Sequence, residues 1–295
     1  MSETVAVLGP GAVGAAVAVP LALTGVQVVC VARPPTADAI RCRGLTLRRG
    51  AEDLVARVHV ADELHEPVDL LLVTVKAPSL EDALDRVRAA AEITVPLLNG
   101  IEHMSTLRRR VAGGSVVAGS IGRIEAFLER PGVVIQPTPS VVMTVASDVP
   151  AATTELLRRS GIDVRVNGSE AEVLWEKLAR QAATAAATSS TQRPIGELRT
   201  DPEWRPRLQA AIGEACAVAE RDGVTLSAEA EWEIIEAMPP LLTSSTARDI
   251  AAGVPSELDA ITGAAVRAGR RVGVDTPELE RMLAEAEERC RLPSR

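Results

Sequence analysis

The sequence predicts an α/β fold with a mainly parallel sheet, followed by an all-helical region. The first half of the chain alternates short apolar runs, which are typical of buried strands, with helical segments. Beyond Asn167-Gly168-Ser169 the short runs stop and long helical segments take over. A chain of 295 residues is long enough for about two domains. We therefore predict a first domain over residues 1–168 and a second over residues 169–295.

The first apolar run is followed by a glycine-rich turn. Val5-Ala6-Val7-Leu8 predicts a buried strand, and Gly9, Gly11 and Gly14 then follow at the G-x-G-x-x-G spacing before an Ala/Val-rich helix. The first glycine permits the tight turn, the second lets backbone approach a pyrophosphate, and the third lets helix and strand pack closely. This pattern predicts a Rossmann-type doubly wound sheet that binds a dinucleotide at the helix start. The predicted cofactor-binding residues of the turn are Gly9, Gly11, Ala12, Val13 and Gly14.

The end of the second predicted strand favours NADP over NAD. This strand, at residues 26–31, runs into Ala32-Arg33, and no acidic residue follows before Asp38. In NAD-binding units an acidic residue here accepts the ribose hydroxyls, whereas a basic residue suits the 2′-phosphate of NADP. Arg33 is therefore the predicted phosphate clamp. The alternative is an ordinary solvated arginine in a loop.

Composition excludes several classes of function. The formal charge of −8 and the near absence of Phe and Tyr argue against binding of nucleic acid. Residues 4–32 carry no charge, but Pro10 and Gly25 divide them, so we predict a strand, a helix and a strand here in place of a membrane span. The four Cys and three His lack the spacing of metal ligands, which predicts no metal site. Without a recognisable targeting segment, the expected location is the cytoplasm.

The remaining elements are predicted from apolar runs and helical periodicity. Further strands are expected at residues 45–47, 55–60, 69–75, 93–98, 115–118, 132–135, 141–145 and 164–166. Helices are expected at residues 12–24, 80–90 and 151–160, and then at 169–188, 202–222, 228–238, 257–272 and 276–291. Ser79 and Thr276 are the expected N-caps of the helices that start beside them.

Lysine occurs only twice, at Lys76 and Lys177, among 32 basic residues. A chain that uses arginine almost everywhere keeps lysine where a compact ammonium with a tunable pKa is required, unless the two positions arose by chance. Lys76 follows a predicted strand, at the edge where open α/β sheets bind ligands. Lys177 shares a helical face with Gln181, Thr184 and Thr188. This polar stripe predicts either a functional site or a solvent-facing surface.

A series of short motifs follows these lysines and the glycine turn along the chain. In order they are the glycine turn with Arg33, Val73-Thr74-Val75-Lys76, Leu98-Asn99-Gly100, Leu174-Trp175-Glu176-Lys177-Leu178, Gly196-Glu197-Leu198, Thr243-Ser244-Ser245 with Asp249-Ile250, and Ser256-Glu257-Leu258-Asp259 before Thr262-Gly263. Each motif alone is weak, but their order and spacing are specific. Together they resemble the ketopantoate reductase (2-dehydropantoate 2-reductase) family over nearly the whole chain.

The resemblance implies an NADPH-dependent enzyme that reduces the 2-oxo acid ketopantoate to pantoate in pantothenate biosynthesis. It makes Lys177 the proton donor and Glu257 a group that contacts cofactor and substrate, and it places Lys76 and Asn99 on the nicotinamide side and Ser245 at the substrate. Hydride would move to the carbonyl carbon while an ammonium stabilises and protonates the oxygen. The predicted catalytic residues are Lys177 and Glu257, and the predicted substrate-binding residues are Asn99, Lys177, Gln181, Ser245 and Glu257.

Three positions depart from the family's pattern. The family has asparagines one and two turns after the lysine, where this chain has Gln181 and Ala185. The family has a third asparagine directly before a later Gly-Glu-Leu, where this chain has Ile195. Those asparagines bind the substrate's carboxylate and hydroxyl, so a different, less hydroxylated 2-oxo acid is the first alternative substrate. A non-catalytic NADP-binding protein is the second alternative, although the presence of Lys177 and Glu257 argues against it. The apolar stripes of the helical domain would also allow a homodimer.

Overall fold

The computed structural model describes residues 3–291, apart from the side chain of Arg123. Contacts divide the chain into two compact units. Unit 1 comprises Met1–Leu98 and His103–Val173, and unit 2 comprises Asn99–Glu102 and Leu174–Arg295. The four residues Asn99–Glu102, here called the 99–102 segment, therefore group with the helical unit although unit 1 flanks them on both sides in the sequence. The prediction of two domains divided after residue 168 did not anticipate this.

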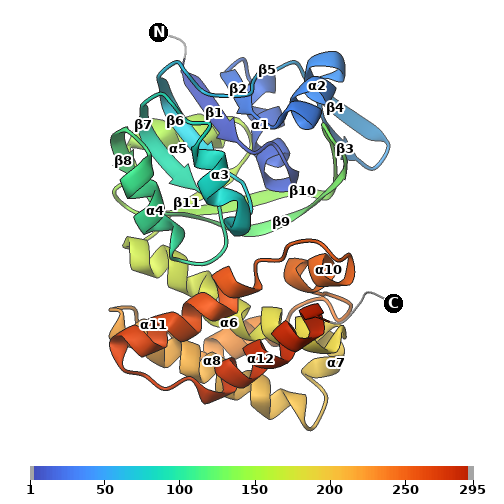
Figure 1. Ribbon diagram of the computed structural model, residues 1–295, viewed down its shortest axis with the longest axis vertical. Coiled ribbons are helices and arrows are strands. Elements are labelled where there is room, and N and C mark those ends of the chain that lie inside the picture. The colour runs from blue at the N-terminus through green and yellow to red at the C-terminus, as the bar shows by residue number, and fades with distance from the viewer. Residues whose placement is uncertain (1–2, 292–295) are drawn as a thin grey trace. The chain divides into compact units, whose positions relative to one another are not determined.

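Unit 1 contains a parallel sheet with helices between its strands (Figure 1). Its elements are β1 (Thr4–Leu8), α1 (Ala12–Leu23), β2 (Gln27–Val31), α2 (Pro34–Arg43), β5 (His59–Ala61), β6 (Val68–Val73), the 3-10 helix η1 (Ala77–Ser79), α3 (Leu80–Leu84), β7 (Ala91–Pro96), α4 (His103–Arg110) and β8 (Gly113–Val116). Within residues 3–291 the sheet has six strands in the order β5-β2-β1-β6-β7-β8, and every neighbouring pair is parallel. This arrangement confirms the predicted Rossmann-type fold.

A second, mixed sheet completes unit 1. Its elements are β3 (Leu45–Arg49), β4 (Glu52–Ala56), β9 (Gly119–Arg130), β10 (Val133–Val145), α5 (Ala151–Arg159) and β11 (Asp163–Val166). The strand order is β11-β10-β3-β4, and β9 pairs antiparallel with β10. Helix α1 contacts strands of both sheets, including β2 of the first and β3 and β10 of the second.

Helix α1 is apolar on every side, and its middle turns are buried on every side. Its side chains from Ala15 to Val19, and that of Leu21, are completely buried. A helix without a polar face is stable in water only inside a protein core. The charge-free stretch of residues 4–32 thus folds as β1, α1 and β2, as predicted. None of the helices between residues 3 and 291 has the length and apolar character that a membrane crossing requires.

Several predicted elements of unit 1 are wrong in extent. The expected strand at residues 55–60 is divided, because β4 pairs with β3 in one sheet and β5 pairs with β2 in the other. The expected helix at residues 80–90 ends at Leu84, because the following backbone from Arg86 to Ala89 hydrogen-bonds to Leu64. Ser79 lies in η1 and its hydroxyl does not cap α3. The two runs at 132–135 and 141–145 form one strand, β10.

Unit 2 is helical, as predicted for the C-terminal region (Figure 1). Its elements are α6 (Glu170–Thr191, from Leu174 onward in this unit), α7 (Ile195–Leu198), α8 (Trp204–Arg221), α9 (Ala228–Glu236), α10 (Ser245–Ala251), the π-helix η2 (Asp259–Gly263), α11 (Ala264–Val272) and α12 (Pro277–Arg291). The helix expected at 257–272 is therefore interrupted by a π turn. Such turns are rare and occur frequently at functional sites.

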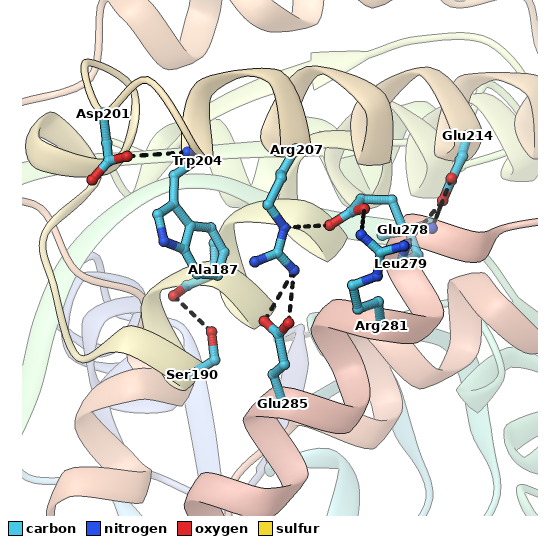
Figure 2. A network of polar contacts seen from close by, with 10 residues as sticks. All are labelled: Ala187, Ser190, Asp201, Trp204, Arg207, Glu214, Glu278, Leu279, Arg281 and Glu285. Carbon is cyan, nitrogen blue, oxygen red and sulfur yellow. Dashed lines mark hydrogen bonds and ion pairs between the residues drawn. The ribbon is translucent and has the colours of Figure 1, made fainter.

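A polar network connects α8 to α12 (Figure 2). The Arg207 guanidinium binds Glu278 at 2.6 Å and Glu285 at 2.9 Å, and it stacks over the Trp204 ring at 4.2 Å. The Glu214 carboxylate accepts from the first amides of α12, including that of Glu278 at 2.8 Å. Glu214 therefore takes the capping role predicted for Thr276, whose hydroxyl is buried and makes no hydrogen bond among the described residues.

Candidate active site

The glycine turn joins β1 to α1 with the backbone geometry that a dinucleotide requires. Gly9 has a φ of +87°, and a Cβ there would collide with the side chain of Val75. A Cβ on Gly14 would lie 2.5 Å from the carbonyl oxygen of Gly9, so the helix start packs directly on the turn. At Gly11 nothing lies within 4 Å of the Cβ position, which leaves the backbone open to a ligand.

The ends of β2 and β6 lie beside this turn. The Gly9 amide donates to the Val31 carbonyl at 3.0 Å, and the Thr74 hydroxyl donates to the Gly9 carbonyl at 2.7 Å. Arg33 follows β2 and Lys76 follows β6, and both side chains are exposed. Because these strands are parallel neighbours of β1, their carboxyl ends share one edge of the sheet. Unit 1 therefore brings the turn, Arg33 and Lys76 to the same edge.

This edge fits a dinucleotide phosphate in charge and in hydrogen-bonding capacity. The first amides of α1, from Ala12 to Gly14, have no carbonyl one turn earlier in the helix to bind. The first turn of α1 carries no acidic side chain that would repel an anion. The positive end of the helix adds to this preference. The cationic side chain of Arg33 suits an additional phosphate, and Arg33 and Lys76 remain predicted cofactor contacts.

Four side chains singled out from the sequence meet within unit 2. Lys177 Nζ donates to Asn99 Oδ1 at 2.8 Å, and Gln181 Nε2 donates to the same oxygen at 3.2 Å. Asn99 Nδ2 in turn donates to Glu257 Oε2 at 2.9 Å. Lys177 and Gln181 lie one turn apart on α6, Asn99 begins the 99–102 segment, and Glu257 lies just before η2. We call these four residues the Lys177 cluster.

The surroundings lower the pKa of the Lys177 ammonium from 10.5 to about 8. Burial is the main cause, because removal from water disfavours the charged form. The negative charge of Glu257 opposes this effect, whereas the positive charge of Arg180 adds to it. Arg180 is itself held by Glu231 at 2.8 Å. An ammonium with a pKa near 8 can release its proton near neutral pH, as a general acid must.

The position of Asn99 depends on the glycine that follows it. Gly100 has a φ of +84°, and a Cβ there would collide with the carbonyl oxygen of Ala260 in η2. A side chain at this position would therefore push the 99–102 segment away from the π-helix and from Glu257. Glycine after Asn99 is therefore required for this close approach.

The rest of the polar stripe and Ser245 lie outside the cluster. The hydroxyls of Thr184 and Thr188 donate to carbonyls one turn earlier in α6. The Thr188 hydroxyl also shares a hydrogen bond of 2.7 Å with the Ser244 hydroxyl. Ser245 starts α10 next to this contact. Thr188 follows Lys177 by about 16 Å along the helix axis, so the contact between Thr188 and Ser244 lies away from the Lys177 cluster. The role of Ser245 at the substrate stays a prediction. The stripe is half-buried to buried, so it is not a solvent-facing surface.

The three positions that depart from the family's asparagines differ from one another. Gln181 retains an amide, and its Oε1 is buried without a hydrogen-bond partner in the described part of the chain. Ala185 and Ile195 are 0% and 1% exposed and supply no polar side-chain group. Only the first of the three positions therefore still offers hydrogen bonding to a ligand.

Sequence reasoning missed Arg180 and Glu231, which shape the charge around Lys177. Arg180 follows Lys177 by three residues, so their shared helical face was a detectable signal. Glu231 lies 51 residues beyond Arg180 and had no such signal. Among residues 3–291, no group of three or more His, Cys, Asp or Glu side chains could hold a metal ion.

Two family models match the chain in succession. The model of ketopantoate reductase PanE/ApbA matches residues 5–147, and the C-terminal model of the same family matches residues 171–289. The 2-dehydropantoate 2-reductase of Caulobacter vibrioides is 29% identical over 282 residues, which cover 93% of this chain and 94% of that protein. The uncharacterized oxidoreductase YkpB of Bacillus subtilis is 27% identical over 293 residues, which cover 94% of this chain and 96% of that protein.

Solved structures agree with the family match. The PanE/ApbA family ketopantoate reductase from Ralstonia eutropha JMP134 is 28% identical and superposes with a TM-score of 0.87 over 98% of both chains. D-mandelate dehydrogenase, solved with NADH and anilino(oxo)acetate, has a TM-score of 0.88 over 98% of both chains at 21% identity and shares the fold.

A Rossmann-type unit with a glycine turn, followed by a helical unit that holds a half-buried lysine, is typical of a nicotinamide-nucleotide oxidoreductase. This chain belongs to the ketopantoate reductase PanE/ApbA family, which confirms the resemblance seen in the sequence. It is accordingly an oxidoreductase, and the cofactor of its family is NADPH.

Proposed function

We propose that this protein reduces ketopantoate to pantoate with NADPH, as a 2-dehydropantoate 2-reductase. The observation that carries the proposal is the Lys177 cluster, in which an ammonium of lowered pKa binds an amide oxygen that a carboxylate orients. This arrangement suits a 2-oxo acid, because reduction of its carbonyl develops negative charge on one oxygen. The matching reductase of Caulobacter vibrioides bears the name of this reaction.

In the proposed mechanism Lys177 stabilises and then protonates the substrate oxygen. NADPH supplies the hydride to the carbonyl carbon when bound. Lys177 donates to Asn99 in the resting site and would transfer this donation to the developing alkoxide, whose basicity draws the proton. Glu257 holds the Asn99 amide so that its oxygen, and not its nitrogen, faces Lys177. In unit 1 the glycine turn, Arg33 and Lys76 would bind the phosphates and the nicotinamide end.

The substrate assignment depends on Gln181. Its buried, unpartnered Oε1 is an acceptor that a substrate hydroxyl could satisfy, which favours a hydroxylated acid such as ketopantoate. Ala185 and Ile195, in contrast, provide no polar group, which favours a less hydroxylated 2-oxo acid. The second candidate substrate is therefore a branched 2-oxo acid without the hydroxymethyl group, such as ketoisovalerate.

Steady-state oxidation of NADPH with ketopantoate and with ketoisovalerate decides between these substrates. A kcat/KM ratio of about 10 or more in favour of ketopantoate supports the proposal, since an unsatisfied buried acceptor costs about 1–3 kcal/mol. A ratio near one or below assigns the second candidate. Gln181→Leu is the matched variant, because it removes the acceptor and should lower the ratio without lowering NADPH affinity.

The same assay tests whether the protein is catalytic at all. Tight NADPH binding without consumption, across a panel of 2-oxo acids, would leave only a nucleotide-binding protein. The role of Arg33 is tested by comparing NADPH with NADH. The unmodified protein should prefer NADPH, and Arg33→Asp should lose this preference.

The proposal also includes a step in pantothenate biosynthesis, residence in the cytoplasm and a homodimer through the helical unit. Sedimentation of the purified protein tests the last of these.

A further inference from the structure

The 99–102 segment is held on the helical unit at both of its ends. At one end Asn99 binds Glu257 at 2.9 Å. At the other end the Glu102 carboxylate receives two parallel bonds from Arg267, from Nε at 2.9 Å and from Nη2 at 2.8 Å. Between them Gly100 lies directly against the Ala260 carbonyl. The segment therefore lies along one continuous stretch of chain, which runs from Glu257 through η2 into α11.

Arg267 of α11 also binds Asp259 at the start of η2, so it joins two parts of the same stretch of chain. Its Nη1 donates to the Asp259 carboxylate at 2.6 Å and its Nη2 donates to the Asp259 carbonyl at 3.0 Å, at the start of η2. Gly263 makes room for this contact, since a Cβ there would lie 2.6 Å from the Asp259 carboxylate. One guanidinium thus joins the 99–102 segment, η2 and α11. A planar guanidinium can hold two carboxylates in this way, whereas a lysine cannot.

The stretch is also anchored to the helix that carries Lys177. The Thr262 hydroxyl, which is buried, donates to the Ala182 carbonyl of α6 at 2.8 Å. Gln181, next to Ala182, and Lys177 both donate to Asn99. A movement of Glu102 away from Arg267 would therefore loosen Asn99, whereas α6 and Glu257 would keep their places.

We propose that Arg267 is a positioning residue, which holds Asn99 between Lys177 and Glu257 by clamping the 99–102 segment to η2. Its role in turnover rests on the proposed function, but its effect on the Lys177 cluster does not. The Arg267 side chain is 40% exposed, so salt should weaken its ion pairs with Glu102 and Asp259.

The scarcity of lysine in this chain makes the test direct. Protein labelled biosynthetically with ε-carbon-13 lysine gives only two side-chain signals, from Lys76 and Lys177, and Lys76→Arg assigns them. Titration by NMR then reports the Lys177 pKa without substrate or turnover, and Lys76 serves as an internal reference.

The expected result is a fall of about 0.5 or more in the Lys177 pKa for Arg267→Gln, because a loosened Asn99 no longer stabilises the ammonium. Loss of a nearby positive charge alone would raise this pKa, so the direction separates positioning from simple electrostatics. Glu102→Gln breaks the same clamp from the other side and should give the same fall. A rise or no change in both variants overturns the proposal.

A double-mutant cycle identifies the route of the effect. Asn99→Ala should lower the Lys177 pKa by itself, and Arg267→Gln should add nothing in that background. Additive effects would mean that Arg267 does not act through Asn99, and the proposal would fail. The matched control is Arg270→Gln, which removes another exposed arginine of α11 that binds Glu280 at 2.8 Å and should leave the Lys177 pKa unchanged.

Kinetics provide the second readout. Arg267→Gln should lower kcat about 3- to 10-fold with NADPH affinity unchanged, because a misplaced catalytic group costs rate more than binding. High salt should lower kcat of the unmodified protein toward that of the variant. If no 2-oxo acid is reduced, the proposed function fails, and the NMR cycle still tests the clamp.

Discussion

Two half-buried cations of unit 2, Arg207 and Lys177, are held in opposite ways. Arg207 lies between Glu278 and Glu285 over the face of Trp204 (Figure 2), and its side chain is 14% exposed. Lys177 donates to the neutral amide of Asn99, and its pKa is lowered because burial is only partly offset by Glu257. The first cation is matched by neighbouring carboxylates, whereas the second is undercompensated.

Under the proposed function, this difference separates a structural site from a catalytic one. A matched buried ion pair holds helices together, and removal of one partner leaves an uncompensated charge. An undercompensated ammonium costs stability but keeps its proton available, which is what a general acid requires. We therefore expect changes at Arg207 to affect stability and changes at Lys177 to affect activity.

The largest expected effect is on turnover in Lys177→Arg. Arginine remains protonated at any working pH, so it can stabilise an alkoxide but cannot readily donate its proton. Loss of a general acid lowers kcat about 10²- to 10⁴-fold. Steady-state kinetics with the best 2-oxo acid measure the loss, and fluorescence titration should show NADPH binding unchanged. Near-normal turnover would remove Lys177 from the mechanism.

A large loss of stability is expected for Arg207→Met. The substitution leaves Glu278, whose side chain is 10% exposed, and Glu285 without their main cation. Breaking a buried pair in this way costs about 3–5 kcal/mol of unfolding free energy. Urea denaturation measures it, and kcat of the folded variant should stay within about 2-fold. If activity falls but stability does not, the assignment of the two sites is reversed.

Lys177→Met should increase stability at neutral pH. Below about pH 8 both the folded and the unfolded chain hold the Lys177 proton, so the folded state bears the full cost of the buried charge. Between about pH 8 and 10.5 the unfolded chain binds the proton more tightly, so stability of the unmodified protein rises with pH. Removal of the amine should add about 2–3 kcal/mol at pH 7 and abolish this rise.

Urea denaturation across pH 6 to 10, on the unmodified protein and on Lys177→Met, gives both quantities. A variant that is less stable at pH 7 would show that the ammonium is well compensated, and the contrast with Arg207 would disappear.

The smallest expected effect belongs to Arg270→Gln. Arg270 binds Glu280 between α11 and α12, but its side chain is 67% exposed. Surface pairs of this kind contribute about 0–1 kcal/mol. Thermal unfolding at low and high salt should show a small difference that salt removes. A loss comparable to that of Arg207→Met would mean that burial does not decide which ion pairs stabilise this unit.

The strand, glycine turn and helix of unit 1 were predictable because their signals are local. The strand, the glycine turn and the helix are consecutive, and Arg33 follows at a strand end, so spacing alone identified them. The prediction of one strand at residues 55–60 was wrong because the two halves pair with different, distant partners, β3 and β2. The prediction that Thr276 caps α12 was wrong because Glu214, from another helix, accepts the hydrogen bond from the Glu278 amide.

In unit 2 the sequence marked the residues of the predicted site but not how they meet. The rarity of lysine, the polar stripe on α6 and the motif around Glu257 marked the members of the site, since helical periodicity and composition are properties of the chain itself. Only the tertiary structure decided that Asn99 links Lys177 to Glu257 and that Arg267 holds the 99–102 segment. Those contacts join residues 78 to 165 positions apart, and their geometry follows from the packing of whole elements, which no local pattern encodes.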